Sequence, residues 1–209
     1  MTEEMSALPG PYGLVLAGGE SRRMGRDKGL IEYRGAAHRQ VLYALLRSVC
    51  ARVFLSVNAV QPRPEPERFE YLVDQPEYAG NGPIGAVMSF RDAHPGIAVL
   101  LVSCDLPFFG PEALQALVAA RDPTRPATAF LNPENDRPEP LVTIYEPRFL
   151  EHLAVHFGRG VRSLQRILLE DPPALIQSYD PRWIYSADTL DDVQRARAVL
   201  GGDAAARRA

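Results

Sequence analysis

The chain has 209 residues, a hydrophobic content of 46% and a formal net charge of −3. This length supports a sizeable core in one domain, and the acidic balance argues against a nucleic-acid partner, because duplex-binding proteins are usually basic. No apolar run approaches the roughly 20 residues that a membrane-spanning helix needs. The first ten residues lack the basic and apolar regions of a secretory signal, and the two cysteines, Cys50 and Cys104, lie in apolar runs. We therefore expect a cytoplasmic protein with reduced thiols and neither a membrane nor a nucleic-acid partner.

Along the chain, short apolar runs alternate with segments of helical spacing. The predicted strands span residues 12–17, 52–58, 69–74, 97–105, 127–131, 140–145 and 174–179. The predicted helices span residues 38–50, 81–93, 110–120, 146–157, 161–170 and 189–200. The first strands are apolar throughout, which is typical of a parallel sheet covered by helices on both faces. The pattern therefore predicts an α/β fold with a mostly parallel central sheet between two helical layers.

The same pattern predicts a single folded domain. We expect an N-terminal extension over residues 1–11, one domain over residues 12–200 and a flexible tail over residues 201–209. The proline-rich stretch at residues 61–68 is too short to link two domains. Thr189 and Asp192 have the spacing of a capping box, which favours a helix start at that point.

Four residues lie at or just past the carboxyl ends of predicted strands: Gly18, Asn58, Asp74 and Asp105. Each alone is weak evidence, because Asp and Asn often end strands through their preference for turns. Ligands of open α/β sheets, however, bind in the crevice beyond the strand carboxyl ends. Four such residues in succession therefore predict a binding site at one edge of the sheet.

The stretch "LVLAGGESRRMGRDKG", residues 14–29, combines glycines with basic side chains directly after the first strand. It lacks the spacing of the Walker A loop and of the dinucleotide-binding fingerprint. Backbone N–H groups of such a turn can still converge on phosphate oxygens, and Arg and Lys add charge. We interpret the stretch as an anion-binding loop; the alternative is a solvated basic loop whose glycines only allow it to turn.

Three further residues have a structural interpretation that we prefer. His152 and His156 have the spacing of a metal-binding pair on a helix, but no third ligand and no glutamate after His152 accompany them. Cys104 ends an apolar strand with no evident base beside it, so we expect it to pack in the core.

The segment "LAGGESRRMGRDK" resembles the L-A-G-G-x-S-x-R-M-G-x-D-K signature of the molybdenum cofactor guanylyltransferases, which are nucleotidyltransferases with a Rossmann-like fold. Other segments resemble the family in the same order. They are "DQPEYAGNGPIGA", "VSCDLPF", "RPEPLVTIYEPRFLEHL" and "GVRSLQRILL". The resemblance extends from about residue 12 to about residue 200, so it implies a single-domain, Rossmann-like three-layer sandwich.

The resemblance implies transfer of GMP from GTP to the terminal phosphate of molybdopterin, with release of pyrophosphate. Molybdoenzyme maturation proteins are possible further partners. By position, it implies nucleotide contacts at Leu16, Ala17, Gly18, Gly19, Lys28, Asn58, Asp74 and Asp105. It also implies that Asp105 binds Mg²⁺, an ion that prefers one or two carboxylates together with phosphate oxygens. Arg23 and Lys28 would offset charge on the leaving pyrophosphate, which makes them catalytic candidates with Asp105.

The chain departs from the family pattern in two places. "SADTLDDV" has Ser186 and Asp188 where the family has asparagines, and Asp188 is an oxygen ligand that we expect to contribute to the metal site. "RGAAHRQV" places His38 and Arg39 at a helix start near the expected site. They are either phosphate contacts or an exposed helix cap, and we favour the cap because His and Arg are often exposed.

The sequence is also compatible with other functions. The same fold would serve cytidylyl transfer to molybdopterin or nucleotidyl transfer to another phosphorylated small molecule. A non-catalytic GTP-binding carrier of the cofactor is a further alternative. The chain reads "LAGG" where CTP-using relatives tend to read "LAAG", so we expect GTP to be preferred.

Overall fold

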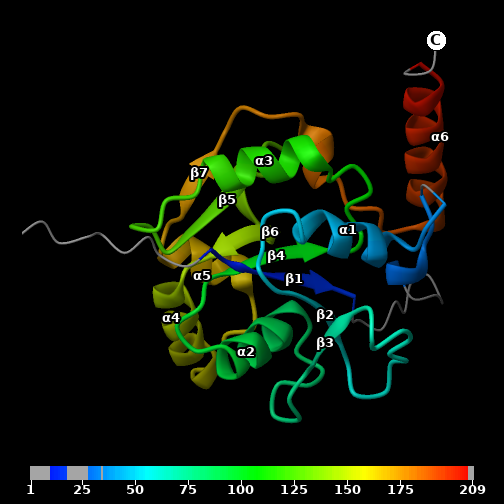
Figure 1. Cartoon of the computed structure of the whole chain (residues 1–209). Helices are drawn as coiled ribbons and strands as arrows, with labels where there is room; N and C mark the ends of the chain where they lie inside the picture. The colour runs from blue at the N-terminus through cyan, green and yellow to red at the C-terminus, as the bar shows by residue number, and fades with distance from the viewer. Residues whose placement is uncertain (1–9, 18–27, 34, 207–209) are drawn as a thin grey trace, which may run out of the picture.

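The computed structural model describes residues 10–17, 28–33 and 35–206, with side chains up to residue 201. A seven-stranded sheet with the order β3-β2-β1-β4-β6-β5-β7 forms its centre (Figure 1). The strands are β1 (Tyr12–Leu16), β2 (Val53–Val57), β3 (Glu70–Val73), β4 (Val99–Ser103), β5 (Ala127–Asn132), β6 (Arg137–Tyr145) and β7 (Ala174–Ile176). Each predicted strand is present, which confirms the α/β assignment.

The sheet is mostly parallel, as predicted, with β6 as the one reversed strand. β1 pairs in parallel with both β2 and β4, and β2 pairs in parallel with β3. β6 is antiparallel to β4 and to β5, whereas β5 and β7 are parallel. The carboxyl ends of all strands except β6 therefore point to one edge of the sheet, and β6 begins at that edge.

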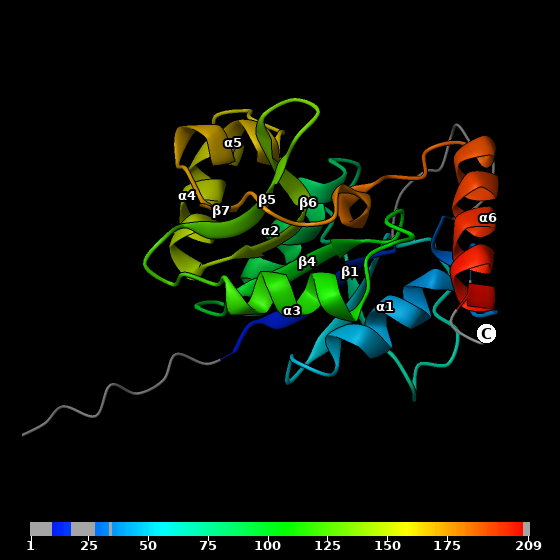
Figure 2. The same ribbon diagram turned by 90° about the horizontal axis from the view of Figure 1, so that it is seen from above.

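Helices cover both faces of the sheet (Figures 1 and 2). On one face α1 (His38–Leu46) and α3 (Pro111–Ala119) pack on the sheet around Val15, Leu100 and Val102. On the other face α2 (Pro83–Ala93), α4 (Pro147–Gly158) and α5 (Leu164–Glu170) pack around Leu14 and Leu101. Successive strand residues thus enter opposite cores, which is the pleated alternation of a strand buried on both faces. The predicted three-layer arrangement is confirmed.

Several element boundaries differ from the prediction. α1 ends at Leu46 and not at residue 50, because the chain tightens there into turns and the Ser48 hydroxyl donates to the Leu45 carbonyl. α5 begins at Leu164, after the Ser163 side chain caps the helix by accepting from the Arg166 N–H. β6 begins at Arg137, three residues before the predicted start, because it closes a hairpin with β5.

The last helix, α6 (Leu190–Ala206), stands at one side of the molecule (Figure 2). The capping box is confirmed: Thr189 N–H donates to Asp192 Oδ2 at 2.9 Å, and Asp192 N–H donates to Thr189 Oγ1 at 3.2 Å. The helix continues to Ala206, six residues beyond the predicted end at residue 200, so the segment expected as a tail begins within α6. Three consecutive alanines of high helix propensity end the helix and offset the cost of about 1 kcal/mol for each glycine before them.

Two 3₁₀ turns complete the described fold, η1 (Lys28–Leu30) and η2 (Pro181–Ile184). The segment after η1 packs against the start of α6, where Ile31 and Tyr33 contact a small cluster of Ala187 and Val193. Among the helices of the described residues, none has the length and apolar character that crossing a bilayer requires.

Candidate active site

The carboxyl ends of β1 to β4 bring five of the predicted nucleotide-binding residues to one edge of the sheet. They are Leu16 and Ala17 at the end of β1, Asn58 after β2, Asp74 after β3 and Asp105 after β4. Backbone hydrogen bonds continue the ladder past the strands, since Ala17 N–H donates to the Ser56 carbonyl at 3.1 Å and Asp74 N–H donates to the Val57 carbonyl at 3.0 Å. The predicted convergence of strand ends is confirmed. Gly18, Gly19 and Arg23 lie outside the described residues.

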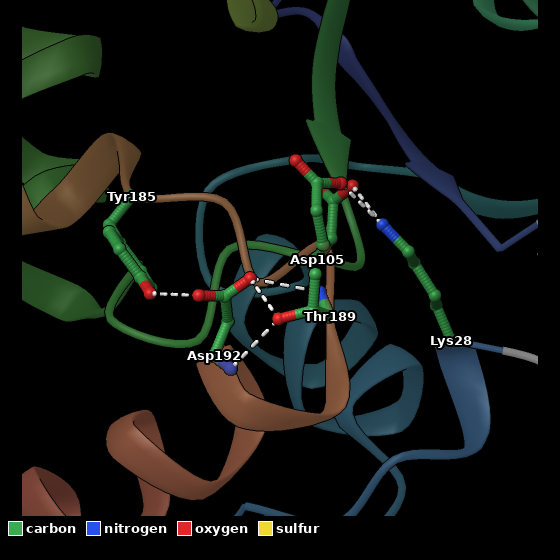
Figure 3. A network of polar contacts seen from close by, with 6 residues as sticks. Lys28, Asp105, Tyr185, Thr189 and Asp192 are labelled. Carbon is green, nitrogen blue, oxygen red and sulfur yellow. Dashed lines mark hydrogen bonds and ion pairs between the residues drawn. The ribbon is translucent and has the colours of Figure 1, made fainter. Parts of the chain in front are cut away.

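Lys28 connects two carboxylates at this edge. Its Nζ lies 2.7 Å from Asp188 Oδ1, and it also lies 3.3 Å from Asp105 Oδ2 (Figure 3). Burial lowers the pKa of the Lys28 ammonium, but the hydrogen bond to Asp188 and the charges of Asp105 and Asp188 outweigh it, so the pKa is raised. Lys28 is therefore fully charged at neutral pH and neutralises part of the paired negative charge.

Asp105 has the environment of a metal-binding carboxylate. Its side chain is only 15% exposed, and its Oδ1 atom is buried without a hydrogen-bond partner among the described residues. A buried carboxylate oxygen without a partner is costly unless a donor or a cation reaches it. Asp188 brings a second carboxylate to the same ammonium, so the donor set fits Mg²⁺, with substrate phosphates and water completing its shell. No group of three or more metal-binding side chains occurs in the described part of the chain.

The segment before α6 is anchored to the site, which explains how Asp188 reaches Lys28. Ala187 N–H donates to the Asp105 carbonyl at 2.8 Å, so the residue before Asp188 is bound directly to the end of β4. On the other side, Tyr185 Oη donates to Asp192 Oδ1 at 3.0 Å, and the capping box joins Asp192 to Thr189 (Figure 3). Asp188 is thus held between two anchored residues.

Asn58 is partly committed to a local turn. Its side-chain oxygen accepts from the N–H groups of Val60 and Gln61 at 3.0 and 2.9 Å. Gln61 in turn accepts from the Asn58 N–H and donates from Nε2 to the Ala17 carbonyl at 3.1 Å. The Asn58 amide nitrogen is therefore the group that remains for a ligand. Sequence reasoning missed Gln61, which joins this turn to the start of the glycine-rich loop.

Asp74 is a partly buried carboxylate at the end of β3. Burial raises its pKa to about 6, although a hydrogen bond from Ser56 Oγ at 3.5 Å acts in the opposite direction. An Asp ordinarily titrates near 3.9, so this side chain changes its charge much closer to neutrality. The next residue is fixed by a bond from Gln75 N–H to Ser89 Oγ of α2 at 2.9 Å.

Two polar residues that sequence reasoning did not assign reach the same edge of the sheet, one on the reversed strand β6 and one at the end of β5. Glu139 lies near the start of β6, and its Oε2 atom is 3.5 Å from Asn132 Nδ2 at the end of β5. The resemblance included the segment "RPEPL", but the predicted strand began after Glu139 and had no assigned direction. The direction of a strand cannot be read from hydrophobicity alone, so the sequence did not predict that Glu139 lies at this edge of the sheet.

The preferred interpretation of His38 and Arg39 as an exposed helix cap is wrong. Both are buried, at 4% exposure each, and the residue before them, Ala37, is the N-cap of α1 without a side-chain bond. His38 Nε2 lies 3.0 Å from the Leu106 carbonyl, one residue past Asp105. The packing of α1 against the loop after β4 buries His38 beside the site, and Arg39 is buried by the packing of the same helix. The average preference of these residue types for the surface does not reveal this.

The remaining candidates lie elsewhere. His152 Nδ1 lies 2.9 Å from Asp171 Oδ2, and His156 Nδ1 lies 3.6 Å from Glu170 Oε2, both at the surface formed by α4 and α5. Cys104 is buried in the core between the sheet and the layer of α1 and α3, as expected for a packing residue.

The chain is similar in sequence to a known protein family and to several known proteins. The family described as MobA-like NTP transferase domain matches residues 13–175. A probable molybdenum cofactor guanylyltransferase of Chloroflexus aggregans is 31% identical, over 90% of this chain and 94% of the relative. A molybdenum cofactor biosynthesis bifunctional protein of Synechocystis sp. is 35% identical over 87% of this chain, which spans only 50% of that longer relative.

Solved structures share the fold. The molybdopterin-guanine dinucleotide biosynthesis protein A of Archaeoglobus fulgidus superimposes with a TM-score of 0.69 at 19% identity, covering 91% of this chain and 99% of that one. A nucleotidyl transferase of Methanothermobacter thermautotroptrophicus gives a TM-score of 0.71 at 15% identity, over 91% of this chain and 97% of that one.

Proposed function

Because the chain belongs to the family of MobA-like NTP transferase domains, we propose that it transfers GMP from GTP to the terminal phosphate of molybdopterin. In this reaction an oxygen of the acceptor phosphate attacks the α-phosphorus of GTP, the bond between the α- and β-phosphates breaks, and pyrophosphate leaves. The single observation that supports the proposal best is the bridge of Lys28 between Asp105 and Asp188 at the sheet edge. The names of the relatives support the choice of GMP and molybdopterin.

The reaction joins two anions, so the site must position them and offset their charge. Lys28 is the described cation nearest to Asp105, and its flexible stem allows the ammonium to turn from the carboxylates to the triphosphate. Arg23, from the same glycine-rich stretch, would offset negative charge on the leaving pyrophosphate. Asp105 and Asp188 would hold Mg²⁺, which when bound neutralises phosphate oxygens at the reacting centre.

Asn58 and Asp74, at the ends of β2 and β3, would recognise the base. An ionised Asp74 accepts hydrogen bonds from two adjacent donors, such as the N1–H and the exocyclic amine of guanine. The Asn58 amide nitrogen donates, and guanine O6 is an acceptor. Cytosine and adenine do not present this pattern, and a site that leaves buried polar groups unpaired rejects the wrong base. Gly18 lacks the methyl group that an alanine would carry, and we expect this to favour the larger purine.

The deciding experiment combines the protein with Mg²⁺, molybdopterin and each of the four nucleoside triphosphates in turn, and identifies the products by mass. We expect the guanine dinucleotide and an equal amount of pyrophosphate, with kcat/KM for GTP at least roughly a hundredfold above that for CTP or ATP. A cytosine dinucleotide formed at the same rate would contradict guanylyl transfer. Nucleotide binding without pyrophosphate release would identify a carrier and not an enzyme.

A further inference from the structure

The sheet order divides the candidate site into two sides. Asn58 and Asp74 lie beyond β2 and β3, on one side of Asp105. β6 and β5 lie on the other side, and they carry Glu139 and Asn132. In-line transfer requires the acceptor to approach the α-phosphorus opposite the leaving pyrophosphate. The side formed by β6 and β5 is therefore available to the acceptor when the nucleotide occupies the side of β1 to β3.

Register places Glu139 level with Asp105. The antiparallel ladder between β4 and β6 ends at the pair Val102 and Val142. Asp105 follows three residues after Val102, and Glu139 precedes Val142 by three residues, so both reach the same edge on neighbouring strands. The two carboxylates are close enough for the charge of Asp105 to raise the pKa of Glu139, after the larger effect of burial.

A carboxylate in this position opposes the proposed chemistry unless it meets a hydrogen-bond donor. Two phosphorylated substrates must come together here, and a partly buried negative charge beside them repels both. The acceptor phosphate needs no general base, because it is already ionised at neutral pH. We therefore expect Glu139 to accept hydrogen bonds from a donor group of a ligand.

The hydrogen bonds of Glu139 and Asn132 leave such capacity. Glu139 Oε1 accepts from the Leu141 N–H at 3.2 Å, and among the described residues Oε2 has only the long contact of 3.5 Å from Asn132. A carboxylate has about four acceptor positions, so acceptor sites remain. Asn132 uses its side-chain oxygen to accept from the Glu134 N–H at 2.9 Å, which leaves its amide nitrogen as a donor. Together the two side chains offer acceptors beside a donor.

We propose that Glu139 and Asn132 form the subsite that binds the pterin ring of the acceptor, an inference that rests on the proposed guanylyl transfer. The pyrimidine edge of a pterin presents N3–H and the 2-amino group as adjacent donors, followed by the 4-oxo oxygen as an acceptor. Glu139 accepts from the two donors and Asn132 donates to the oxygen. Asn132, at the end of β5, lies two strand spacings, about 10 Å, from β4, and Glu139 lies on β6 between them.

The test uses the full chain with its guanine site saturated by a non-hydrolysable GTP analogue and Mg²⁺, so that a pterin cannot bind there. The probes are 6-hydroxymethylpterin and the matching lumazine, in which a carbonyl oxygen replaces the 2-amino group. Binding is followed by the fluorescence of each probe. We expect the unmodified protein to bind the pterin at least roughly tenfold more tightly than the lumazine, because the lumazine oxygen faces the carboxylate. Equal affinities, or no pterin binding, would overturn the proposal.

Two variants extend the test. Glu139→Gln retains the size and the bond to Leu141 but removes the charge, and we expect it to lose the preference for pterin and to raise KM for molybdopterin roughly tenfold or more. KM for GTP is expected to stay within about twofold. Glu134→Gln, exposed on the same hairpin and bonded only through its backbone, is the matched control and is expected to change neither value.

The outcomes separate the subsite from the reaction itself. If the unmodified protein forms the guanine dinucleotide and Glu139→Gln lowers only the melting temperature, Glu139 braces the hairpin and the proposal is wrong. If the unmodified protein forms no dinucleotide with any triphosphate, the proposed function fails. A pterin preference that disappears in Glu139→Gln would still support the subsite in that case.

Discussion

Lys28 and Asp188 are 160 positions apart in the chain, and their Nζ and Oδ1 atoms lie 2.7 Å apart. Asp105, from the middle of the sheet, shares the same ammonium. The site therefore combines a glycine-rich loop, a central strand and the entry to the last helix, and each makes a separate contribution that a substitution can remove.

The first prediction concerns the negative charge that the Asp105 carboxylate contributes to the candidate site. Asp105→Asn keeps the size of the side chain but removes the charge that we assign to the metal and phosphate site. We expect kcat to fall by about a hundredfold or more, with a small change in the free energy of unfolding, because the fold bonds to its backbone carbonyl and not to Oδ1. Single-turnover kinetics and denaturant unfolding measure the two quantities. Activity within a few-fold of the parent would exclude Asp105 as a metal ligand.

Lys28 contributes charge, and its shape matters less. We expect Lys28→Ala to weaken GTP binding and slow transfer by at least about tenfold, and Lys28→Arg to recover part of both, because arginine keeps the charge but not the compact ammonium. Isothermal titration calorimetry with GTP and Mg²⁺ gives the affinity. If the alanine variant binds GTP as the parent does, then Lys28 has no role in holding the triphosphate.

The third prediction concerns the metal requirement. Asp188→Asn restores the family residue, so we expect an active enzyme that needs a higher Mg²⁺ concentration, because one negative ligand becomes neutral. Asp188→Ala removes the oxygen as well and is expected to cost far more activity. Asp191→Asn, at an exposed neighbouring position, is the control. If activity depends on the Mg²⁺ concentration in the same way in the parent and both Asp188 variants, Asp188 is only a turn residue before α6 and not a metal ligand.

Asp74 predicts a dependence on pH. Its pKa of about 6 exceeds the ordinary value near 3.9, so the folded protein holds this proton more tightly than the unfolded chain does. The stabilisation from protonation is full below about pH 4 and is lost as pH rises through about 6. We expect Asp74→Asn to raise the free energy of unfolding at pH 7.5, by about 1 kcal/mol after solvent screening is considered, and to have little effect at pH 4.

Protonation of Asp74 stabilises the fold, but we expect it to weaken the binding of GTP. The ionised carboxylate accepts from guanine, so GTP affinity in the parent should fall as pH decreases below about 6. Asp74→Asn should bind GTP weakly at every pH and lose this dependence. A parent affinity that is constant between pH 5 and pH 7.5 would contradict the assignment of Asp74 to the base.

Much of the fold followed from the sequence, because apolar runs and helical spacing record burial directly. The strand ends at Asn58, Asp74 and Asp105 were predicted for the same reason, since a parallel sheet sends them to one edge. The direction of β6 was not predicted, because an apolar run carries no sign of which way it is paired. Burial of His38 and Arg39 was missed because it depends on the tertiary packing of α1, for His38 against the loop after β4, which no local pattern encodes.

The anchoring of Ala187 to Asp105 also sets the order in which a growing chain can acquire activity. Domains fold as units during synthesis, beginning from the N-terminal part. Every strand of the sheet, from β1 to β7, has been made before residue 188 is added. All seven strands are therefore synthesised before the second carboxylate exists, and a message cut short after β7 would encode every strand of the sheet but not Asp188.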